Sequence, residues 1–378
     1  MPKIVVLHLI SPTGYYGAER WVVAQVRHLD PTRVEAHIAV TREGDDESPE
    51  ILARARALGL STHEITLAHR FDPRAASSVA KLACALDARV LHGHGYKSDL
   101  LAVLARRRAE AAVVSTPHGF EKALSPKMRL YLAAGRWALQ RAEVVAPLSS
   151  ELEHRLLEMG VSASHIRLIE NGVDLSEIEA ELAAAPKVEN DPRRHSSERL
   201  LVYVGRLTPL KNLDAMIRAF AKLCERREGV RLILVGEGPE RAALLEQVNR
   251  SAAKGRVDFL GYREDRLSLL RHCEIFSMSS TTEGIPRSMM EAMAMGLPAV
   301  AFDIPGVDKL LRNGETGIAV KLNDCEALAS AWERLIDDEP SRLRMGAAAR
   351  RHIVEHYSAQ RMASEYEKLY LELAGPAS

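Results

Sequence analysis

The sequence lacks the features that mark several classes of protein. Its 378 residues include four cysteines, at positions 84, 224, 273 and 325, and no Cys-x-x-Cys pair. That spacing excludes a disulfide framework and a cysteine zinc site, and it favours reduced thiols in a cytoplasmic protein. No apolar run approaches the roughly 18 residues of a membrane-spanning helix. The apolar run at residues 4–10 has no cleavage pattern after it, so it predicts a buried strand and not a signal peptide.

An excess of charge of one sign is also missing. Lys and Arg number 51, and so do Asp and Glu, so the formal net charge is zero. A balanced chain does not favour nucleic acid as a partner. With 47% apolar residues, the chain can nevertheless bury the cores of more than one domain.

Short apolar runs alternate with segments of helical period along the whole chain. In the first half, the predicted strands lie at residues 4–10, 36–41, 63–67, 89–92, 112–116, 144–147 and 166–169. Residues 181–198 then hold prolines and clustered charge, which predict a linker. The alternation restarts at residue 199 with strands such as "LLVYVG" and "VRLILVG".

We therefore predict an α/β fold with two Rossmann-like, doubly wound parallel sheets. Nearly continuous apolar strands separated by helices are typical of parallel sheets that are covered on both faces. The first domain is expected at residues 1–180 and the second at residues 199–357. Ligands of such sheets bind beyond the carboxyl ends of the strands, so we expect the two domains to face each other across a cleft.

The loop "SPTGYYGAERW" follows the first predicted strand. Gly14 and Gly17 let the backbone turn and expose N–H groups, and the next helix directs its positive end toward the strand ends. This arrangement suits a phosphate group. An ordinary strand-to-helix turn is the alternative.

Two segments place histidines directly after strands. "STPHGF" puts His118 at the cleft, the alternative being an ordinary core or surface histidine. "HGHGYKSD" puts His92 and His94 two residues apart, a spacing that suits a metal, but no third ligand is evident in the sequence. We therefore interpret this segment as a loop that lines the cleft.

The first strand of the second half is followed by "GRLTPLKN". Arg206 and Lys211 lie five residues apart across a turn. A planar guanidinium and a compact ammonium together suit a diphosphate, whereas two solvated surface cations are the alternative. "LVGEGPER" also contains Gly-x-Gly, but Arg241 replaces the third glycine of the dinucleotide fingerprint, so a nicotinamide cofactor is not indicated.

The segment "EGIPRSMMEAMAMG" contains two carboxylates. Glu283 lies in a turn before a predicted helix, whose first backbone N–H groups are unpaired and can donate to hydroxyl or phosphate oxygens. Glu291 lies inside that helix among apolar neighbours, and its carboxylate can accept two hydrogen bonds from a vicinal diol such as a ribose. In the alternative interpretation, Glu283 complements the helix dipole and Glu291 pairs with a cation.

Together, five features resemble the retaining glycosyltransferases of family 4, in group 1, which have the GT-B fold. They are Glu283-x7-Glu291, "GRLTPLKN", "ENGVD" at residues 170–174, the N-terminal glycine loop and the last helix "SAQRMASEYEKLYLELA". The resemblance covers nearly the whole chain. It implies that a sugar moves, with retention of configuration, from a nucleotide-diphosphate donor to a hydroxyl of a glycan or lipid-linked acceptor. Bacterial surface polysaccharide, lipopolysaccharide and glycolipid synthesis use such transfers.

We expect a UDP-sugar as the donor, with GDP-mannose as the second choice. A nucleotide-sugar epimerase or hydrolase of the same architecture is the alternative. The sequence contains no Asp-x-Asp triplet, which often carries the metal for such donors, so we expect neither a metal nor another cofactor.

The resemblance also implies roles for individual residues. Arg206 and Lys211 would hold the diphosphate, Glu291 the ribose hydroxyls and Glu283 the donor sugar, while His118 would lie beside the transferring carbon. The other residues implied at the donor are Gly17, Glu237, Tyr262, Arg263, Gly284, Ile285, Pro286 and Arg287. Those on the acceptor side are Gly14, Tyr15, Tyr16 and His94. The last helix, at residues 358–378, is expected to pack back on the first domain.

A basic stretch in the first half suggests one further partner. Nine basic and three acidic residues lie between Lys97 and Arg141, together with apolar Tyr131, Leu132 and Trp137. Such a stretch suits contact with an anionic membrane that holds a lipid-linked acceptor. A solvated helix face is the alternative. We expect a cytoplasmic protein with peripheral contact on the inner face of the membrane.

Overall fold

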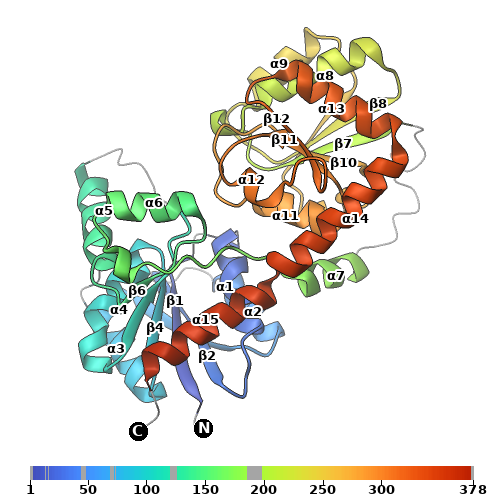
Figure 1. Cartoon of the computed structure of the whole chain (residues 1–378). Coiled ribbons are helices and arrows are strands. Elements are labelled where there is room, and N and C mark those ends of the chain that lie inside the picture. The colour runs from blue at the N-terminus through green and yellow to red at the C-terminus, as the bar shows by residue number, and fades with distance from the viewer. Residues whose placement is uncertain are drawn as a thin grey trace. The chain divides into compact units, whose positions relative to one another are not determined.

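The protein consists of two units, each with its own parallel sheet. A computed structural model describes residues 3–12, 14–15, 17–43, 48–68, 72, 74–119, 126–184 and 198–375. Unit 1 comprises Met1–Gly172 and Ala359–Ser378, and unit 2 comprises Val173–Ser358. Each unit is a six-stranded sheet with helices on both faces (Figure 1), which confirms the predicted fold class.

Unit 1 has the strand order β3-β2-β1-β4-β5-β6, with every neighbouring pair parallel. Its strands are β1 (Ile4–Ile10), β2 (Val34–Glu43), β3 (Ser61–Leu67), β4 (Val90–His94), β5 (Ala112–Ser115) and β6 (Val144–Val145). Its helices are α1 (Gly17–Arg27), α2 (Glu50–Ala57), α3 (Ala75–Leu86), α4 (Tyr96–Ala109), α5 (Pro126–Leu139), α6 (Ser150–Glu158), η1 (Ala163–His165) and α15 (Ala359–Ala374).

Alternation along β1 shows why this sheet is apolar on both faces. Val6 and Ile10 belong to the core beneath α1 and α15, whereas Leu7 and Leu9 belong to the core beneath α3 and α4. Helices cover both faces, so both sets of side chains are buried. The strand predicted at residues 166–169 is wrong: Ile166 makes only a single parallel bridge with Val145.

Unit 2 has the strand order β12-β11-β10-β7-β8-β9. Its strands are β7 (Arg199–Val204), β8 (Val230–Val235), β9 (Val257–Gly261), β10 (Ile275–Met278), β11 (Ala299–Phe302) and β12 (Gly317–Val320). Its helices are α7 (Leu175–Ala184), η3 (Pro209–Lys211), α8 (Leu213–Arg226), α9 (Arg241–Asn249), α10 (Arg266–Leu270), α11 (Arg287–Ala294), α12 (Val307–Leu310), α13 (Cys325–Asp337) and α14 (Glu339–His356).

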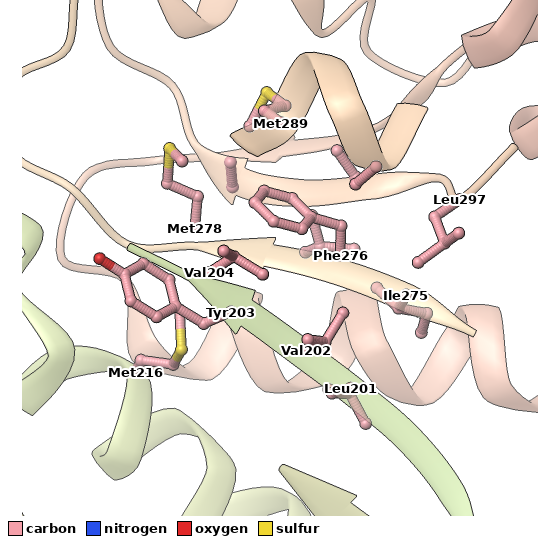
Figure 2. Close-up of a cluster of buried hydrophobic side chains, with 14 of the residues drawn as sticks. Leu201, Val202, Tyr203, Val204, Met216, Ile275, Phe276, Met278, Met289 and Leu297 are labelled. Atoms are coloured by element: carbon pink, nitrogen blue, oxygen red, sulfur yellow. The ribbon is translucent and has the colours of Figure 1, made fainter. Parts of the chain in front are cut away.

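The core of unit 2 centres on the adjacent strands β7 and β10. Figure 2 shows Met289 of α11 on one side of these strands, and Tyr203 beside Met216 of α8 on the other. Phe276 of β10 is fully buried between them. This packing fixes the strand ends from which the polar loops of the unit depart.

The division into units differs from the predicted boundaries. Unit 1 ends at Gly172 and not at residue 180, because α7 packs against α10 of unit 2. Of the predicted linker, residues 181–184 belong to α7 and residues 185–197 lie outside the described residues. Helix α15 falls in unit 1, where it packs on β1, β4 and α1. None of the described helices is long and apolar enough to cross a bilayer.

Candidate functional site

Unit 2 has a topological switch point between β7 and β10. From β7 the chain continues through β8 and β9 on one side of the sheet, and then returns to β10 on the other side. The loops after these two strands therefore leave in opposite directions, and ligands of doubly wound sheets bind in the resulting crevice. Arg206 and Lys211 follow β7, and Glu283 follows β10.

Lys211 and Glu283 meet at this switch point. The Lys211 ammonium Nζ donates to Glu283 Oε1 at 2.6 Å, and Ser280 Oγ donates to the same oxygen at 2.5 Å. Only 9% of the Glu283 side chain is exposed, compared with 25% of Lys211. The two residues, 72 positions apart, are thus brought into direct contact by the sheet topology.

Backbone contacts hold the Lys211 loop against the loop that follows β10. Ser279 Oγ donates to the Lys211 carbonyl at 2.9 Å, and the Thr281 N–H donates to the Leu210 carbonyl at 2.9 Å. Asn212 then adopts a left-handed conformation with φ of 50°, which ends η3 and starts α8. The ammonium is therefore presented by a turn that is fixed on both sides.

Arg206 differs from Lys211 in having no side-chain partner among the described residues. Its side chain is exposed, while its carbonyl accepts a hydrogen bond from the Tyr203 hydroxyl at 3.0 Å. Burial, and then the nearby Glu283 charge, raise the pKa of Tyr203, so this hydroxyl stays a donor. Arg206 is accordingly available for an anion that arrives from solution.

Glu291 of α11 lies at the centre of an ionic network. Arg266 donates to both carboxylate oxygens, from Nε at 3.0 Å and from Nη2 at 2.8 Å. Arg287 Nε donates to Oε1 at 2.9 Å, and its Nη2 donates to Glu177 of α7 at 2.9 Å. Arg266 Nη1 also lies 3.9 Å from Glu181 Oε2.

This network explains how an acid that is 3% exposed remains ionised. Burial by itself would raise the pKa of Glu291, but the positive charges of Arg266 and Arg287 outweigh burial and lower it to about 2. The structure thus shows the cation pairing given above as the alternative to ribose binding. A carboxylate accepts about four hydrogen bonds, so the three present leave about one position open for a ligand.

Arg266 is the functional candidate that sequence reasoning missed. It lies 25 residues before Glu291, on a different helix, and no spacing rule connects the two positions. The sequence likewise gave no sign that Glu177 joins this network, because Glu177 lies on α7, before the first strand of the second sheet. Only the packing of α7 and α10 beside α11 brings these charges together.

Three of the residues implied at the donor, Glu237, Tyr262 and Arg263, follow β8 and β9, which meet at their carboxyl ends. The Gly236 N–H donates to the Gly261 carbonyl at 2.7 Å. Gly236 has φ of 136°, and a Cβ there would lie 1.9 Å from the Gly205 carbonyl oxygen, so only glycine fits. Tyr262 is 61% exposed, whereas Arg263 is paired through two hydrogen bonds with Asp265.

Glu237 and the first residues of α11 complete the predicted donor set. Glu237 is exposed, with its carboxylate 3.8 Å from Arg241 Nε. Ile285 and Pro286 are buried, while Gly284 and Arg287 are partly exposed. A Cβ on Gly306, after β11, would lie 1.7 Å from the Gly284 carbonyl, so the two loops are in close contact.

Unit 1 has a cavity of about 560 Å³ at its own switch point, between β1 and β4. Loops after β1, β2, β4 and β5 line this cavity, and they include Gly14, His94 and His118. Tyr15 packs against the core, with the guanidinium groups of Arg20 and Arg54 5.2 and 5.3 Å from its ring centre. Gly17 begins α1 and is exposed, and Tyr16 lies outside the described residues.

His8 supplies the third imidazole that the sequence did not reveal. It faces the same side of the sheet as His92 and His94, and their ring nitrogens lie within 4.8 Å of one another. The His8 and His94 rings are nearly parallel, with an interplanar angle of 5° and centroids 5.4 Å apart, and His8 Nδ1 lies 3.1 Å from His94 Nε2. A separation of 3.1 Å between ring nitrogens is that of a hydrogen bond between the two imidazoles.

His92 is held by hydroxyl groups at both ring nitrogens. Nδ1 lies 2.6 Å from the Tyr370 hydroxyl, and Nε2 lies 2.8 Å from Thr116 Oγ1. Gln25 donates to the same Tyr370 hydroxyl at 2.7 Å. Both ring nitrogens of His92 and of His94 therefore lie within hydrogen-bond distance of a partner, an arrangement that favours a structural polar core over a metal site.

Burial keeps these histidines uncharged at neutral pH. It lowers the pKa of His8 to about 3 and that of His118 to about 4. The pKa values of His92 and His94 are also lowered well below the ordinary value, first by burial and then by neighbouring imidazoles. The buried histidine cluster at the carboxyl end of the unit 1 sheet is thus polar and neutral.

Two family profiles match the chain in tandem. Glycosyltransferase Family 4 matches residues 15–177, and Glycosyl transferases group 1 matches residues 186–352. The chain therefore belongs to the group 1, family 4 glycosyltransferases, which confirms the family resemblance seen in the sequence.

Similar curated proteins span most of the chain. The N-acetyl-alpha-D-glucosaminyl L-malate synthase of Bacillus anthracis is 24% identical over 317 residues, which cover 80% of each chain. The phosphatidyl-myo-inositol mannosyltransferase of Mycolicibacterium smegmatis is 28% identical over 313 residues, covering 81% of this chain and 77% of that one. A UDP-Gal:alpha-D-GlcNAc-diphosphoundecaprenol alpha-1,3-galactosyltransferase of Escherichia coli is 26% identical over 294 residues, 75% of each.

Solved structures share the fold at lower identity. A glycosyltransferase from Rickettsia africae superposes with a TM-score of 0.81 at 18% identity and covers 100% of both chains. Anabaena HepE in complex with UDP and glucose gives a TM-score of 0.78 at 20% identity, covering 97% of this chain and 99% of that one. These likenesses identify the GT-B fold.

Proposed function

We propose that this glycosyltransferase moves a sugar from a nucleotide-diphosphate donor to a hydroxyl of a glycan or lipid-linked acceptor. The observation that carries the proposal is the placement of Lys211, Glu283 and the unpaired Arg206 side chain at the switch point of unit 2. This set offers two cations to a diphosphate and a carboxylate to the hydroxyls of the sugar.

A UDP-sugar is our first choice of donor. Support comes from the Escherichia coli relative, whose name specifies UDP-Gal, and from the UDP bound to the Anabaena protein. GDP-mannose remains second, since another relative is a mannosyltransferase. Bacterial surface polysaccharide or glycolipid synthesis is the corresponding role.

The chemistry asks the enzyme to stabilise a departing diphosphate. Positive charge develops on the sugar and negative charge on the leaving group as the glycosyl–phosphate bond breaks. Arg206 and Lys211 would stabilise the negative charge at a preformed site, and the N-terminus of α11 would contribute partial positive charge. We therefore propose a transfer that needs no metal.

Glu283 acts as a sugar-binding carboxylate in this proposal and not as a nucleophile. Its Oε1 accepts hydrogen bonds from Lys211 and Ser280, which lower its nucleophilicity. Attack by the acceptor on the same face as the leaving group, with a phosphate oxygen taking the hydroxyl proton, would retain configuration. A covalent sugar trapped on Glu283 would overturn this mechanism.

The remaining unit 2 residues would recognise the nucleoside. Tyr262 is exposed enough to stack on a base, and Glu237 lies on the neighbouring strand end. The open position on the Glu291 carboxylate would accept one ribose hydroxyl, while Arg266 and Arg287 keep this acid ionised.

The cavity of unit 1 is our candidate for the acceptor hydroxyl. Its walls are polar and include Ser11, Thr41 and His118. On α5, Leu130 is 75% exposed and Trp137 37% exposed, beside exposed Arg129 and Arg136. These four residues form two adjacent pairs seven positions apart along the helix, and they would contact an anionic membrane that holds a lipid-linked acceptor.

The decisive experiment incubates the full chain with a panel of nucleotide sugars, with and without polyprenyl-diphosphate glycan or glycolipid acceptors. Nucleotide release that requires an acceptor, with the α-linkage of the donor kept and with EDTA present, supports the proposal. Release or sugar interconversion without acceptor would instead establish a hydrolase or an epimerase.

The membrane contact is tested by sedimentation with vesicles of phosphatidylglycerol. We expect binding at low salt, and its loss in a variant with Arg129→Ser, Leu130→Ser and Trp137→Ser. The matched control replaces Leu104, exposed at 53% on α4, by Ser. Absence of binding by the unaltered chain at low salt would remove the membrane from the proposal.

A further inference from the structure

A line of three imidazoles runs from the unit 1 cavity into the core. His118 Nε2 lies 3.5 Å from His94 Nδ1, and His94 Nε2 lies 3.1 Å from His8 Nδ1. His118 and His94 line the cavity, whereas His8 is fully buried in β1. Each contact therefore joins one nitrogen of one ring to one nitrogen of the next.

Because the three rings are uncharged, each carries a single ring proton, and the contacts can be satisfied in two ways. With the protons directed inward, His118 donates to His94, and His94 donates to His8. With the protons directed outward, His8 donates to His94, and His94 donates to His118. The two arrangements differ in whether an N–H group or a lone pair is left over on the outermost nitrogen at each end of the line.

The inner end of the line decides between the two arrangements. His8 Nε2 is buried and has no hydrogen-bond partner among the described residues. The inward arrangement would leave an unpaired N–H there, whereas the outward one leaves only an unpaired lone pair. Buried N–H groups without a partner are rarer than under-used acceptors, so the outward arrangement is favoured.

We propose that His8 and His94 are positioning residues that hold His118 with its ring proton on Nδ1, so that His118 donates a hydrogen bond to the substrate. This inference rests on the proposed function, which puts His118 in the wall of the cavity that would hold the acceptor hydroxyl. His94 occupies the Nε2 lone pair of His118, and the line ends inside the core without an exit for a proton. His118 is therefore a hydrogen-bond donor and not a general base.

Packing fixes the rings in the positions that the line requires. The Trp21 ring lies 5.1 Å from His118 and 5.4 Å from His94, measured between centroids. His92 lies 4.2 Å from His94 and is itself held by Tyr370 and Thr116. The low pKa of His118, about 4, keeps the ring neutral where the enzyme would work.

The first test reads the tautomer directly. Two-dimensional long-range ¹H–¹⁵N NMR of the full chain, labelled only at histidine nitrogen, distinguishes a proton on Nδ1 from one on Nε2. The His118 signals are assigned by their loss in His118→Gln. We expect His118 to be neutral with its proton on Nδ1 between pH 6 and 8, and a proton on Nε2 would overturn the proposal.

Substitutions then test the line itself. His94→Leu removes both contacts, so we expect a mixture of His118 tautomers and a fall in kcat of about tenfold, the value of one neutral hydrogen bond, with little change in KM. His94→Asn keeps an amide near the position of Nδ1, so it should restore the Nδ1 tautomer and most of kcat. An unchanged tautomer in His94→Leu would overturn the proposal.

A matched control lies in the same sheet. His37 Nδ1 and His63 Nε2 are also 3.1 Å apart, but this pair lies on β2 and β3. His63→Leu should change neither the His118 tautomer nor kcat, and a change as large as that of His94→Leu would indicate a general structural effect and contradict the inference. The NMR readout needs no substrate, so it fails or succeeds independently of the proposed transferase activity.

Discussion

The two units share one sheet architecture but stabilise their buried polar groups in opposite ways. Beside the switch point of unit 1, the buried polar cluster of His8, His92 and Tyr370 consists of uncharged imidazoles and hydroxyl groups, whereas charged side chains such as Arg42 and Lys97 lie at the more exposed cavity wall. Beside the switch point of unit 2, buried Glu291 is ionised and enclosed by two arginines. The topology therefore sets where a site lies, whereas the side chains set whether it suits a neutral hydroxyl or an anion.

The largest expected difference between the two units is that a fall in pH destabilises unit 1 before unit 2. The lowered pKa values of His8, His92, His94 and His118 mean that the folded unit 1 binds fewer protons than the unfolded chain below pH 6.5. Its stability is then lost as the pH falls from about 6.5 toward 4, by about 1.4 kcal/mol for each unit of pKa shift. Asp99, with a pKa raised to about 7, acts in the opposite direction but is a single group.

In unit 2, the lowered pKa of Glu291 preserves the network until the pH falls from about 4.5 toward 2. Hydrogen exchange of the full chain, followed by mass spectrometry at pH 7, 6 and 5 and corrected for the intrinsic exchange rate at each pH, should show protection lost first in β1 and β4. Earlier loss of protection in α11 would contradict the expected difference in acid stability between the two units.

Removal of Arg266 is the next largest expected effect. Arg266→Met leaves Glu291 buried with only Arg287, which should destabilise the protein by about 3–5 kcal/mol. Arg263→Met is the matched control, because Arg263 makes an equally bidentate but exposed pair with Asp265, worth about 1 kcal/mol or less. Urea unfolding measures both, and equal losses would show that burial of the ion pair is unimportant.

Substitution of Arg206 tests whether the positive charge at the unit 2 switch point contributes to catalysis. Arg206→Ala should lower kcat by about 10²–10³, corresponding to about 2.7–4 kcal/mol of transition-state stabilisation, with unchanged stability. Lys211→Ala should lower kcat similarly and also destabilise, since Glu283 would lose its ion pair. Steady-state kinetics beside thermal unfolding distinguish the two, and a stability loss in Arg206→Ala would contradict the difference drawn between them.

The smallest effect concerns the neutral network of unit 1. Tyr370→Phe removes the hydroxyl that joins His92 and Gln25, which should cost about 1–3 kcal/mol. Tyr357→Phe is the control in unit 2, where the hydroxyl donates to the Lys309 carbonyl at 3.1 Å. Because no charge is involved, the cost of Tyr370→Phe should be the same at 50 mM and 500 mM salt, and a strong salt dependence would refute the neutral description.

Sequence reasoning succeeded for the sheets and for the loops that follow their strands. Apolar runs predicted the sheets, and the loops after them contained Lys211 and Glu283, which the structure brings into contact. It failed where a partner comes from a distant element. His8 looks like one polar residue in an apolar strand, and Arg266 has no periodic relation to Glu291. Only tertiary packing connects such pairs.

The sequence could not predict which group pairs with Glu291, for a related reason. A buried carboxylate in an apolar helix requires compensation, and the sequence offered either a diol or a cation as the partner. The choice depends on where α7 and α10 pack, and this is not encoded in the local pattern around residues 283–291.

Helix α15 has a consequence for how the protein is made. Unit 1 begins at the first residue of the chain, yet α15, which supplies Tyr366 and Tyr370 to its core, occupies residues 359–374. During synthesis on the ribosome, the part of the unit 1 sheet that α15 covers therefore stays exposed until α15 has been made, after the whole of unit 2. Domains usually fold in N-to-C order during synthesis, whereas here unit 2 can fold before the core of unit 1 is complete.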